Sequence, residues 1–160
     1  MHQDKNALDR HIKRWTKCVE CKYGKSTLNR FVYQGPNNPK YLFVLEHPTE
    51  SQDLIGDTSL SPWADLYTGT TYALPCTPYA TSKRDRLATC SLLPEIKVCS
   101  PRLTELYGIL HYPKVFAFGI AGKACKHQDV PFIQMPSSAS IVSNIVDRQR
   151  MVLILKKEMV

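Results

Sequence analysis

The chain has 160 residues, 43% of them hydrophobic and 22% charged, and its 21 basic residues exceed its 14 acidic ones to give a net charge of +7. This size allows one domain with a substantial core, and no apolar run approaches the ~18 residues that a membrane-spanning helix needs. The polar N-terminus is unlike a secretory signal, so we expect a cytoplasmic protein without a membrane partner. The basic excess fits a nucleic-acid partner and a merely basic, soluble protein equally well.

Helices and strands are expected to alternate along the chain. A short basic helix over residues 5–17 leads into "CVEC", and Ser100 can cap a helix that starts at Pro101. "IAGKACKH" indicates a short helix, and residues 144–158 form a final helix or, because of their "VLIL" run, a strand. Apolar runs predict strands at 41–46, 70–76, 114–119 and 130–135.

This alternation predicts an α/β protein, because a helix between two strands returns the chain to a parallel sheet. We expect a three-layer α/β/α sandwich with a central parallel sheet of about four strands. The whole chain, residues 1–160, is expected to form a single domain with an N-terminal cysteine-bearing segment.

Six cysteines are many for a chain that is expected to stay in a reducing compartment, where clustered cysteines more often bind metal than form disulfides. Cys18 and Cys21 form a CxxC, which places two thiolates within reach of one metal centre. Two further ligands are available among Cys76, Cys90, Cys99 and Cys125. Four thiolates suit either an iron–sulfur cluster or zinc, and the alternative for Cys90 and Cys125 is a buried, small apolar side chain.

The order of motifs resembles the uracil-DNA glycosylase superfamily, most closely its iron–sulfur branch, family four, over about residues 15–140. The motifs are the CxxC, a strand ending in an acidic Pro-containing loop, a strand ending in Cys-x-Pro, a Cys-x-x-Leu helix start and a strand ending in Pro-Ser. "LEHPTESQDLIG" keeps the register of the family's first motif at Glu46, Pro48, Glu50, Asp53 and Gly56. The resemblance implies [4Fe-4S] ligands at Cys18, Cys21, Cys76 and Cys99, with Cys90 as a rival for the fourth and zinc as the alternative metal.

Two positions depart from the family's pattern. The Asn that reads the uracil edge is replaced by Tyr72, and the His of the His-Pro-Ser motif is replaced by Met135, whose thioether cannot donate a proton. The stacking aromatic of the family has its nearest counterpart in Trp63. The resemblance therefore implies a base pocket formed by Trp63, Tyr72 and Met135 that has lost both of its base-facing donors.

Cleavage of an N-glycosidic bond needs an acidic group near the sugar and a donor facing the departing base. Glu46 and Asp53 could serve the sugar side. His47 could supply a donor from another direction, although a histidine at this point is more often a plain loop residue. Losing one preorganised donor typically lowers the rate by ~10²–10³, so two losses predict little or no excision.

The phosphate-binding residues are better preserved than the base-reading ones. Hydroxyls at strand ends suit DNA phosphates and come from Thr49, Ser51, Ser137 and Ser138. Basic residues near the cysteine-bearing loops are Lys83, Arg84, Arg86 and Arg102, and Lys13, Arg14 and Lys17 flank the CxxC. They could follow a DNA backbone with little sequence preference, and the alternative is a solvated surface.

The favoured function is a DNA-binding, non-catalytic accessory module of DNA replication or repair, of viral origin, that uses a glycosylase scaffold. The alternative is an active glycosylase that removes uracil or another modified base. A third possibility is a zinc-bound structural protein unrelated to DNA. The expected partners are DNA and, as the resemblance permits, a DNA polymerase or another replication protein.

Overall fold

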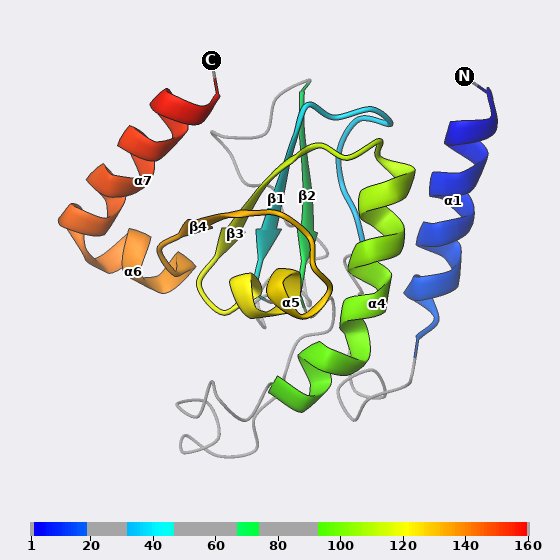
Figure 1. The fold of residues 1–160 in the computed structure, drawn as a ribbon, viewed down its shortest axis with the longest axis horizontal. Coiled ribbons are helices and arrows are strands. Elements are labelled where there is room, and N and C mark those ends of the chain that lie inside the picture. Colours follow the sequence, from blue (N-terminus) through cyan, green and yellow to red (C-terminus); the bar gives the residue numbers. More distant parts are fainter. Residues whose placement is uncertain (1, 19–31, 47–66, 74–92, 160) are drawn as a thin grey trace.

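A four-stranded sheet forms the centre of the computed structural model, which describes residues 2–18, 32–46, 67–73 and 93–159 (Figure 1). The strands are β1 (Tyr41–Leu45), β2 (Thr68–Tyr72), β3 (Lys114–Phe118) and β4 (Ile133–Met135). They are parallel throughout, in the order β2-β1-β3-β4. The helices are α1 (His2–Thr16), α4 (Leu93–Ile109), α5 (Ala121–His127), α6 (Ser138–Ser143) and α7 (Ile145–Glu158). The α/β class and the parallel sheet predicted from the sequence are confirmed.

β1 forms at the centre of the sheet because every one of its residues can be buried. Its pleat directs Phe43 to one face of the sheet and Leu42 and Val44 to the other. β2 lies earlier than the predicted span 70–76, since its Thr-rich residues pair with β1 along the whole strand. β4 is shorter than the predicted span 130–135 and, within the described ranges, pairs with β3 at the edge of the sheet.

Helices cover both faces of the sheet and complete the three layers (Figure 1). α1, α4 and α5 lie on one face, and α6 and α7 on the other. The first face encloses what we call the aliphatic core: Leu8, Tyr33, Leu42, Val44, Ala73, Cys99, Leu103, Leu106, Leu110, Val115, Ala117, Ala121, Ala124, Cys125 and Val130. The second encloses the aromatic core: Tyr41, Phe43, Leu45, Tyr72, Phe116, Phe118, Met135, Met151 and Leu155.

The predicted start of a helix at Ser100-Pro101 is wrong. α4 begins at Leu93 and runs through Pro101, which lies in its interior. Proline has no N–H to donate to the carbonyl of Lys97, four residues earlier. The Ser100 hydroxyl donates to this carbonyl instead, at 2.9 Å, so the missing backbone bond is replaced by a side-chain bond.

The final helix is confirmed over its predicted length, and its strand alternative is excluded. Asn144 is the N-cap of α7, and its side-chain oxygen accepts from the backbone N–H groups of Val146 and Asp147. The predicted short helix after β3 is also confirmed, as α5. In the ranges that the structure describes, no helix combines the length and apolarity needed to span a membrane.

Candidate functional site

The carboxyl ends of three strands meet at one edge of the sheet. Glu46 follows β1, Gly119 follows β3, and Ser137 and Ser138 follow β4. β1 has β2 on one side and β3 on the other, so the chain changes direction across the sheet between β1 and β3. In open parallel sheets, ligands bind outside the carboxyl ends of the strands at such a switch point. The sequence prediction that Glu46 and the Pro-Ser loop share one site requires this proximity.

Glu46 and Ser138 are joined directly, although 92 residues separate them in the sequence. The Ser138 hydroxyl donates to Glu46 Oε1 at 2.7 Å, and the Ser138 backbone N–H points to the same oxygen at 3.3 Å. A hydrogen bond from a hydroxyl to a carboxylate is stronger than one between neutral groups. This pair therefore holds the loop after β4 against the end of β1.

Gly119 makes the close approach possible. Its φ is +53°, in the left-handed region, and a Cβ at this position would lie 3.0 Å from Ser137 Cβ and 3.2 Å from Glu46 Cδ. Its N–H donates to the Met135 carbonyl at 3.2 Å. A larger residue would strain the backbone and also separate the two sides of the site.

The two serines of the predicted phosphate loop make hydrogen bonds within the chain. Ser138 donates to Glu46, and the Ser137 hydroxyl oxygen is the N-cap of α6, accepting from the Ser140 N–H at 3.1 Å. A phosphate at this loop would meet the Glu46 carboxylate. Thr49, Ser51, Lys83, Arg84 and Arg86, the other predicted phosphate contacts, lie outside the described residues.

The two substituted base-reading positions are buried in the aromatic core. Tyr72 is 2% exposed and Met135 is 1% exposed, and both belong to the cluster that packs under α7. Met135 ends β4 directly before the loop that contacts Glu46. The remaining residues predicted for the base and sugar sides, namely His47, Asp53 and Trp63, lie outside the described residues.

Arg102 is not a surface cation, contrary to the sequence prediction that placed it among DNA-backbone contacts. It is 1% exposed, and its guanidinium donates to Thr71 Oγ1 at 2.9 Å and to the Tyr72 carbonyl oxygen. A third, longer contact reaches the Val32 carbonyl at 3.5 Å. Arg102 therefore ties α4 to the carboxyl end of β2, and no local sequence signal distinguishes it from an exposed helical arginine.

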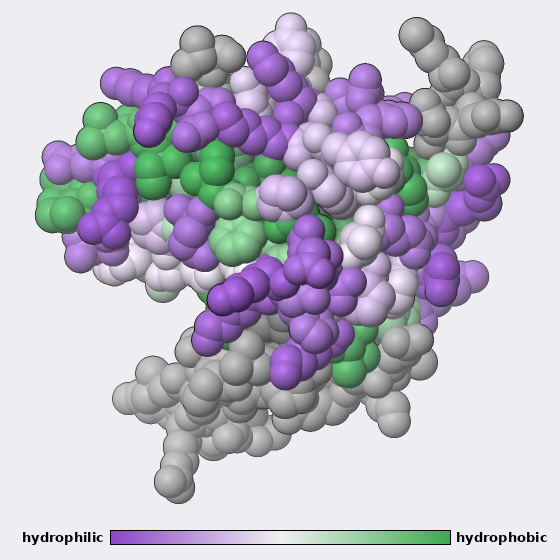
Figure 2. Space-filling view, in the orientation of Figure 1, coloured by the Kyte–Doolittle hydropathy of each residue, from purple (hydrophilic) through white to green (hydrophobic). Residues whose placement is uncertain are grey.

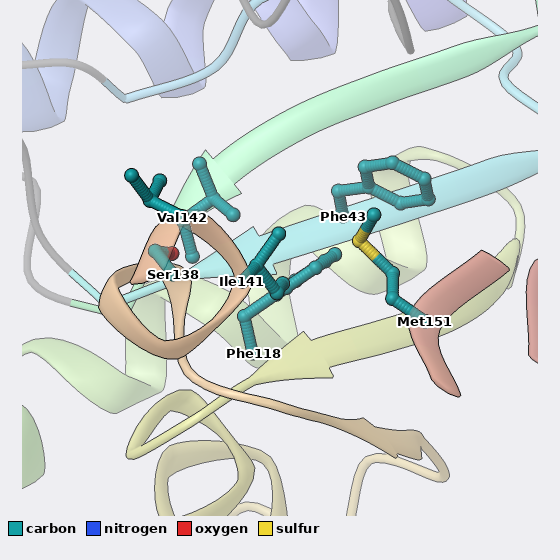
Figure 3. A pocket seen from close by; sticks show the side chains of 7 residues that line it. Phe43, Phe118, Ser138, Ile141, Val142 and Met151 are labelled. Carbon is teal, nitrogen blue, oxygen red and sulfur yellow. The ribbon is translucent and has the colours of Figure 1, made fainter. Parts of the chain in front are cut away.

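An apolar pocket of about 160 Å³ lies beside Ser138, between the sheet and α6–α7 (Figure 3). Its lining comprises Phe43, Leu45, Phe118, Ser138, Ile141, Val142 and Met151. Figure 3 shows Phe118, Ile141 and Met151 converging on the space between the strands and the helices. The sequence could not reveal this pocket, because its lining comes from four separate elements.

Two of the four predicted cluster ligands lie in the described part of the chain. α1 and α4 run antiparallel side by side, and His11 Nδ1 lies 3.0 Å from Glu105 Oε1 (Figure 1). Cys18 lies two residues beyond the end of α1, and Cys99 lies in α4 six residues before Glu105, so both are toward the same end of this antiparallel helix pair.

The other cysteines lie either outside the described residues or in the core. Cys21, Cys76 and the rival Cys90 lie outside the described residues, and within the described ones no three metal-ligating side chains gather together. Cys99 is buried in the aliphatic core and Cys18 is half-buried. Cys125 is fully buried, and its burial raises the pKa of the thiol to about 12, as expected of a small apolar core residue.

His11 is a buried histidine that the sequence analysis did not single out. Burial lowers its pKa, against the raising effect of its hydrogen bond to Glu105. The ring is therefore neutral at pH 7, and Nδ1–H donates to the carboxylate. Nε2 is buried without a hydrogen-bond partner in the described structure, so protonation would place an unpartnered N–H in the core.

Comparison with protein-family models and with curated proteins finds no match to this sequence. The resemblance to the glycosylase superfamily therefore depends on the sequence motifs alone and stays a prediction.

Proposed function

We propose that this chain is a nucleic-acid-binding module with a glycosylase-like scaffold and that it does not excise bases. The observation that carries the proposal is the burial of both substituted base-reading positions, Tyr72 and Met135, in the aromatic core. A departing uracil gathers negative charge, which a donor must stabilise. A buried thioether offers no proton, and the tyrosine ring fills volume that a flipped pyrimidine would need.

The position of the Glu46 carboxylate also fits a glycosylase-like scaffold. Glu46 stays at the switch point, held by Ser138 at 2.7 Å, where a sugar-side carboxylate would act in an enzyme. This retention is the one feature that favours the second candidate, an active glycosylase with a different donor. The two candidates differ in one measurable property, which is whether a base leaves the DNA.

The proposed cofactor is a [4Fe-4S] cluster held by Cys18, Cys21, Cys76 and Cys99, with zinc as the alternative. The position of Cys18 and Cys99 toward the same end of the antiparallel α1–α4 pair supports a shared metal centre. In such a site the cluster would have a structural role and would connect the N-terminal helix to α4. Replacement of Cys18 by Ser is expected to yield protein without the brown colour of a cluster.

Nucleic acid is proposed to bind along basic residues rather than in the Pro-Ser loop. The exposed side chains Lys13 and Lys17 lie on the last turns of α1 and directly after it, next to Cys18. Lys123 and Lys126 are exposed on α5, which follows the carboxyl end of β3. Together with the net charge of +7, these residues favour contact with phosphates.

The test is single-turnover excision on uracil-containing single- and double-stranded oligonucleotides, with protein in excess. We expect no abasic product, while the same oligonucleotides bind with an affinity that falls as salt rises. Glu46→Gln is the control for a residual reaction, because it removes the carboxylate and keeps the shape. Excision by the wild type that Glu46→Gln abolishes would establish the enzyme and overturn the proposal.

The nucleic-acid part has its own test in a pair of matched variants. Lys13→Ala with Lys17→Ala is expected to lower the slope of log K against log salt by about 2, about one for each lost phosphate contact. Lys156→Ala with Lys157→Ala removes the same charge from α7 and is expected to leave the slope unchanged. Equal effects of the two pairs would mean that only net charge matters and that no binding surface exists on α1.

A further inference from the structure

α7 is apolar on two opposite sides, which is unusual for a helix at the surface. Met151 and Leu155 are buried against the aromatic core, while Ile145 is 64% exposed and Leu153 67% exposed. Val142, at the end of α6, is 77% exposed. A surface helix normally has one apolar stripe facing the core, so a second one indicates a surface that another molecule covers.

One of the exposed apolar residues borders the apolar pocket. Val142 is both a lining residue of the pocket and the most exposed of these side chains. The pocket's interior is formed by Phe43, Phe118 and Met151, with a volume of about 160 Å³ (Figure 3). This volume suits one large apolar side chain, and an anchor in a pocket with an apolar rim is the usual form of a binding hot spot.

The charge around this surface is positive. Arg150, Lys156 and Lys157 are exposed on α7. The Arg148 guanidinium donates to the carbonyls of Ile141 and Val142 at 3.0 and 2.8 Å, which places its charge at the rim of the pocket.

The acidic residues of α7 are engaged in pairs. Asp147 accepts from the Ser140 hydroxyl at 2.5 Å and lies 3.8 Å from Arg150. Glu158 pairs with Lys114 at 2.5 Å. Figure 2 shows the result as hydrophobic surface over α7 interspersed with hydrophilic side chains.

From this combination we propose that the surface of α6 and α7 binds an acidic, amphipathic helix of a partner protein. One large apolar side chain of that helix enters the pocket, and its carboxylates face Arg148, Arg150 and the two lysines. Complementary charge of this kind sets the orientation and speeds the encounter, while the anchor supplies most of the affinity.

Three other occupants fit the surface less well. A second copy of the chain would bring the basic residues of two α7 helices together, with like charges opposed. A nucleic acid would meet the basic residues but would leave the aliphatic side chains between them without apolar contacts. Helices that lie on an anionic membrane typically insert Trp, Phe or Leu. Only Leu153 is of this kind among the exposed apolar residues of α6 and α7, the others being Val142, Ile145 and Val146.

The experiment uses the full chain and a fluorescent peptide of about 18 residues, designed with Leu and Phe on one helical face and Glu on its flanks. A scrambled peptide of the same composition has the same net charge but no continuous apolar face when it is helical. We expect the designed peptide to bind at least about tenfold tighter than the scrambled one. Equal binding of the two peptides would mean that only charge attracts them and would overturn the proposal.

Two variants locate the binding. Val142→Glu is expected to weaken the designed peptide about tenfold or more, because it places a carboxylate at the rim of the pocket, and the exposure of Val142 should leave the melting temperature unchanged. Tyr112→Ser is the control, since Tyr112 is an apolar residue of similar exposure, 70%, that does not line the pocket. Unchanged peptide affinity in Val142→Glu would overturn the assignment to this surface.

The rival occupants have their own readouts. Phosphatidylserine-containing vesicles and sedimentation velocity of the chain alone test a membrane and self-association. Binding to vesicles or dimer formation that Val142→Glu abolishes, without peptide binding, would overturn the proposal in favour of that occupant. The surface lies on the opposite face of the sheet from α1, so Lys13 and Lys17, whose loss the salt-slope test measures, are not part of it.

Discussion

The two faces of the sheet are built differently. The aliphatic core is covered by α1, α4 and α5, and its buried polar side chains include Arg102 and His11, each bonded to oxygen atoms of another element. Among the described residues, the aromatic core is covered by α6 and α7, with an apolar pocket beside Met151 and exposed aliphatic side chains. In the described part of the chain, one face is closed and joined by specific polar bonds, and the other is more open and apolar.

This difference suggests that the closed face contributes mainly to the stability of the fold, whereas the apolar face is available for binding another molecule. Polar bonds in a closed core specify how elements meet, and their loss leaves buried groups unsatisfied. An open apolar surface adds little specificity to the fold, but it can bind another molecule. The candidate site lies where the two faces meet, at the carboxyl edge of the sheet, with Glu46 and Ser138 joining β1 to the loop after β4.

The largest effect on the free energy of unfolding is expected from removing the hydrogen bonds of Arg102 on the closed face. Arg102→Met keeps most of the side-chain volume but leaves the Tyr72 carbonyl and the Thr71 hydroxyl without their charged donor. We expect the free energy of unfolding to fall by about 3 kcal/mol, measured by urea denaturation. Lys123→Met, on the exposed surface of α5, is the control and should change it by less than about 0.5 kcal/mol. A similarly small effect of Arg102→Met would mean that the two faces do not differ in this way.

An intermediate effect is expected at the junction of the two faces. Gly119→Ala places a methyl group 3.0 Å from Ser137 and 3.2 Å from Glu46, on a backbone with φ of +53°. The free energy of unfolding should fall by about 1–2 kcal/mol from the left-handed backbone alone, and more if the loop after β4 must move. Gly108→Ala is the matched control, because a Cβ there meets nothing within 4 Å and alanine favours the helix. Equal stability of the two variants would contradict the close approach.

The smallest effect is expected in the pH dependence of the free energy of unfolding, through His11 on the closed face. Burial holds the pKa of His11 below its usual 6.5, so the unfolded chain takes up a proton near pH 6.5 and the folded chain only at lower pH. The folded state is therefore destabilised as pH falls through 6.5, by up to about 1.4 kcal/mol for each pH unit until the lowered pKa is reached. Burial, the largest single influence, opposes ionisation of Glu105, but the hydrogen bond from His11 and the nearby positive charges together outweigh it and lower the pKa, so this carboxylate stays charged.

His11→Asn tests this assignment. Its amide can replace the Nδ1–H donor to Glu105 but has no proton to gain between pH 7.5 and 5.5. The stability difference between these two pH values, measured by urea denaturation, should shrink relative to the wild type, by at most about 1.4 kcal/mol. An unchanged difference would mean that another group on the molecule titrates in this range.

The fold could be predicted from the sequence where one residue pattern has one explanation. The apolar runs of β1 and β3 are buried on both sides, and α5 begins two residues after Gly119, in a run of small residues. The prediction failed at α4, because a serine followed by proline is also the usual start of a helix. Here a hydrogen bond from Ser100 to the Lys97 carbonyl allows the helix to continue through Pro101.

The sequence by itself determined the α/β class, the parallel strands and the position of Glu46 at the end of β1, because strand periodicity and strand ends are local properties of the chain. Only the tertiary structure decided that Ser138 donates to Glu46, that Arg102 is buried under β2 and that an apolar pocket opens beside α7. Each of these depends on contacts between segments distant in sequence. Such contacts are chosen by packing and by the satisfaction of buried polar groups, which no single segment encodes.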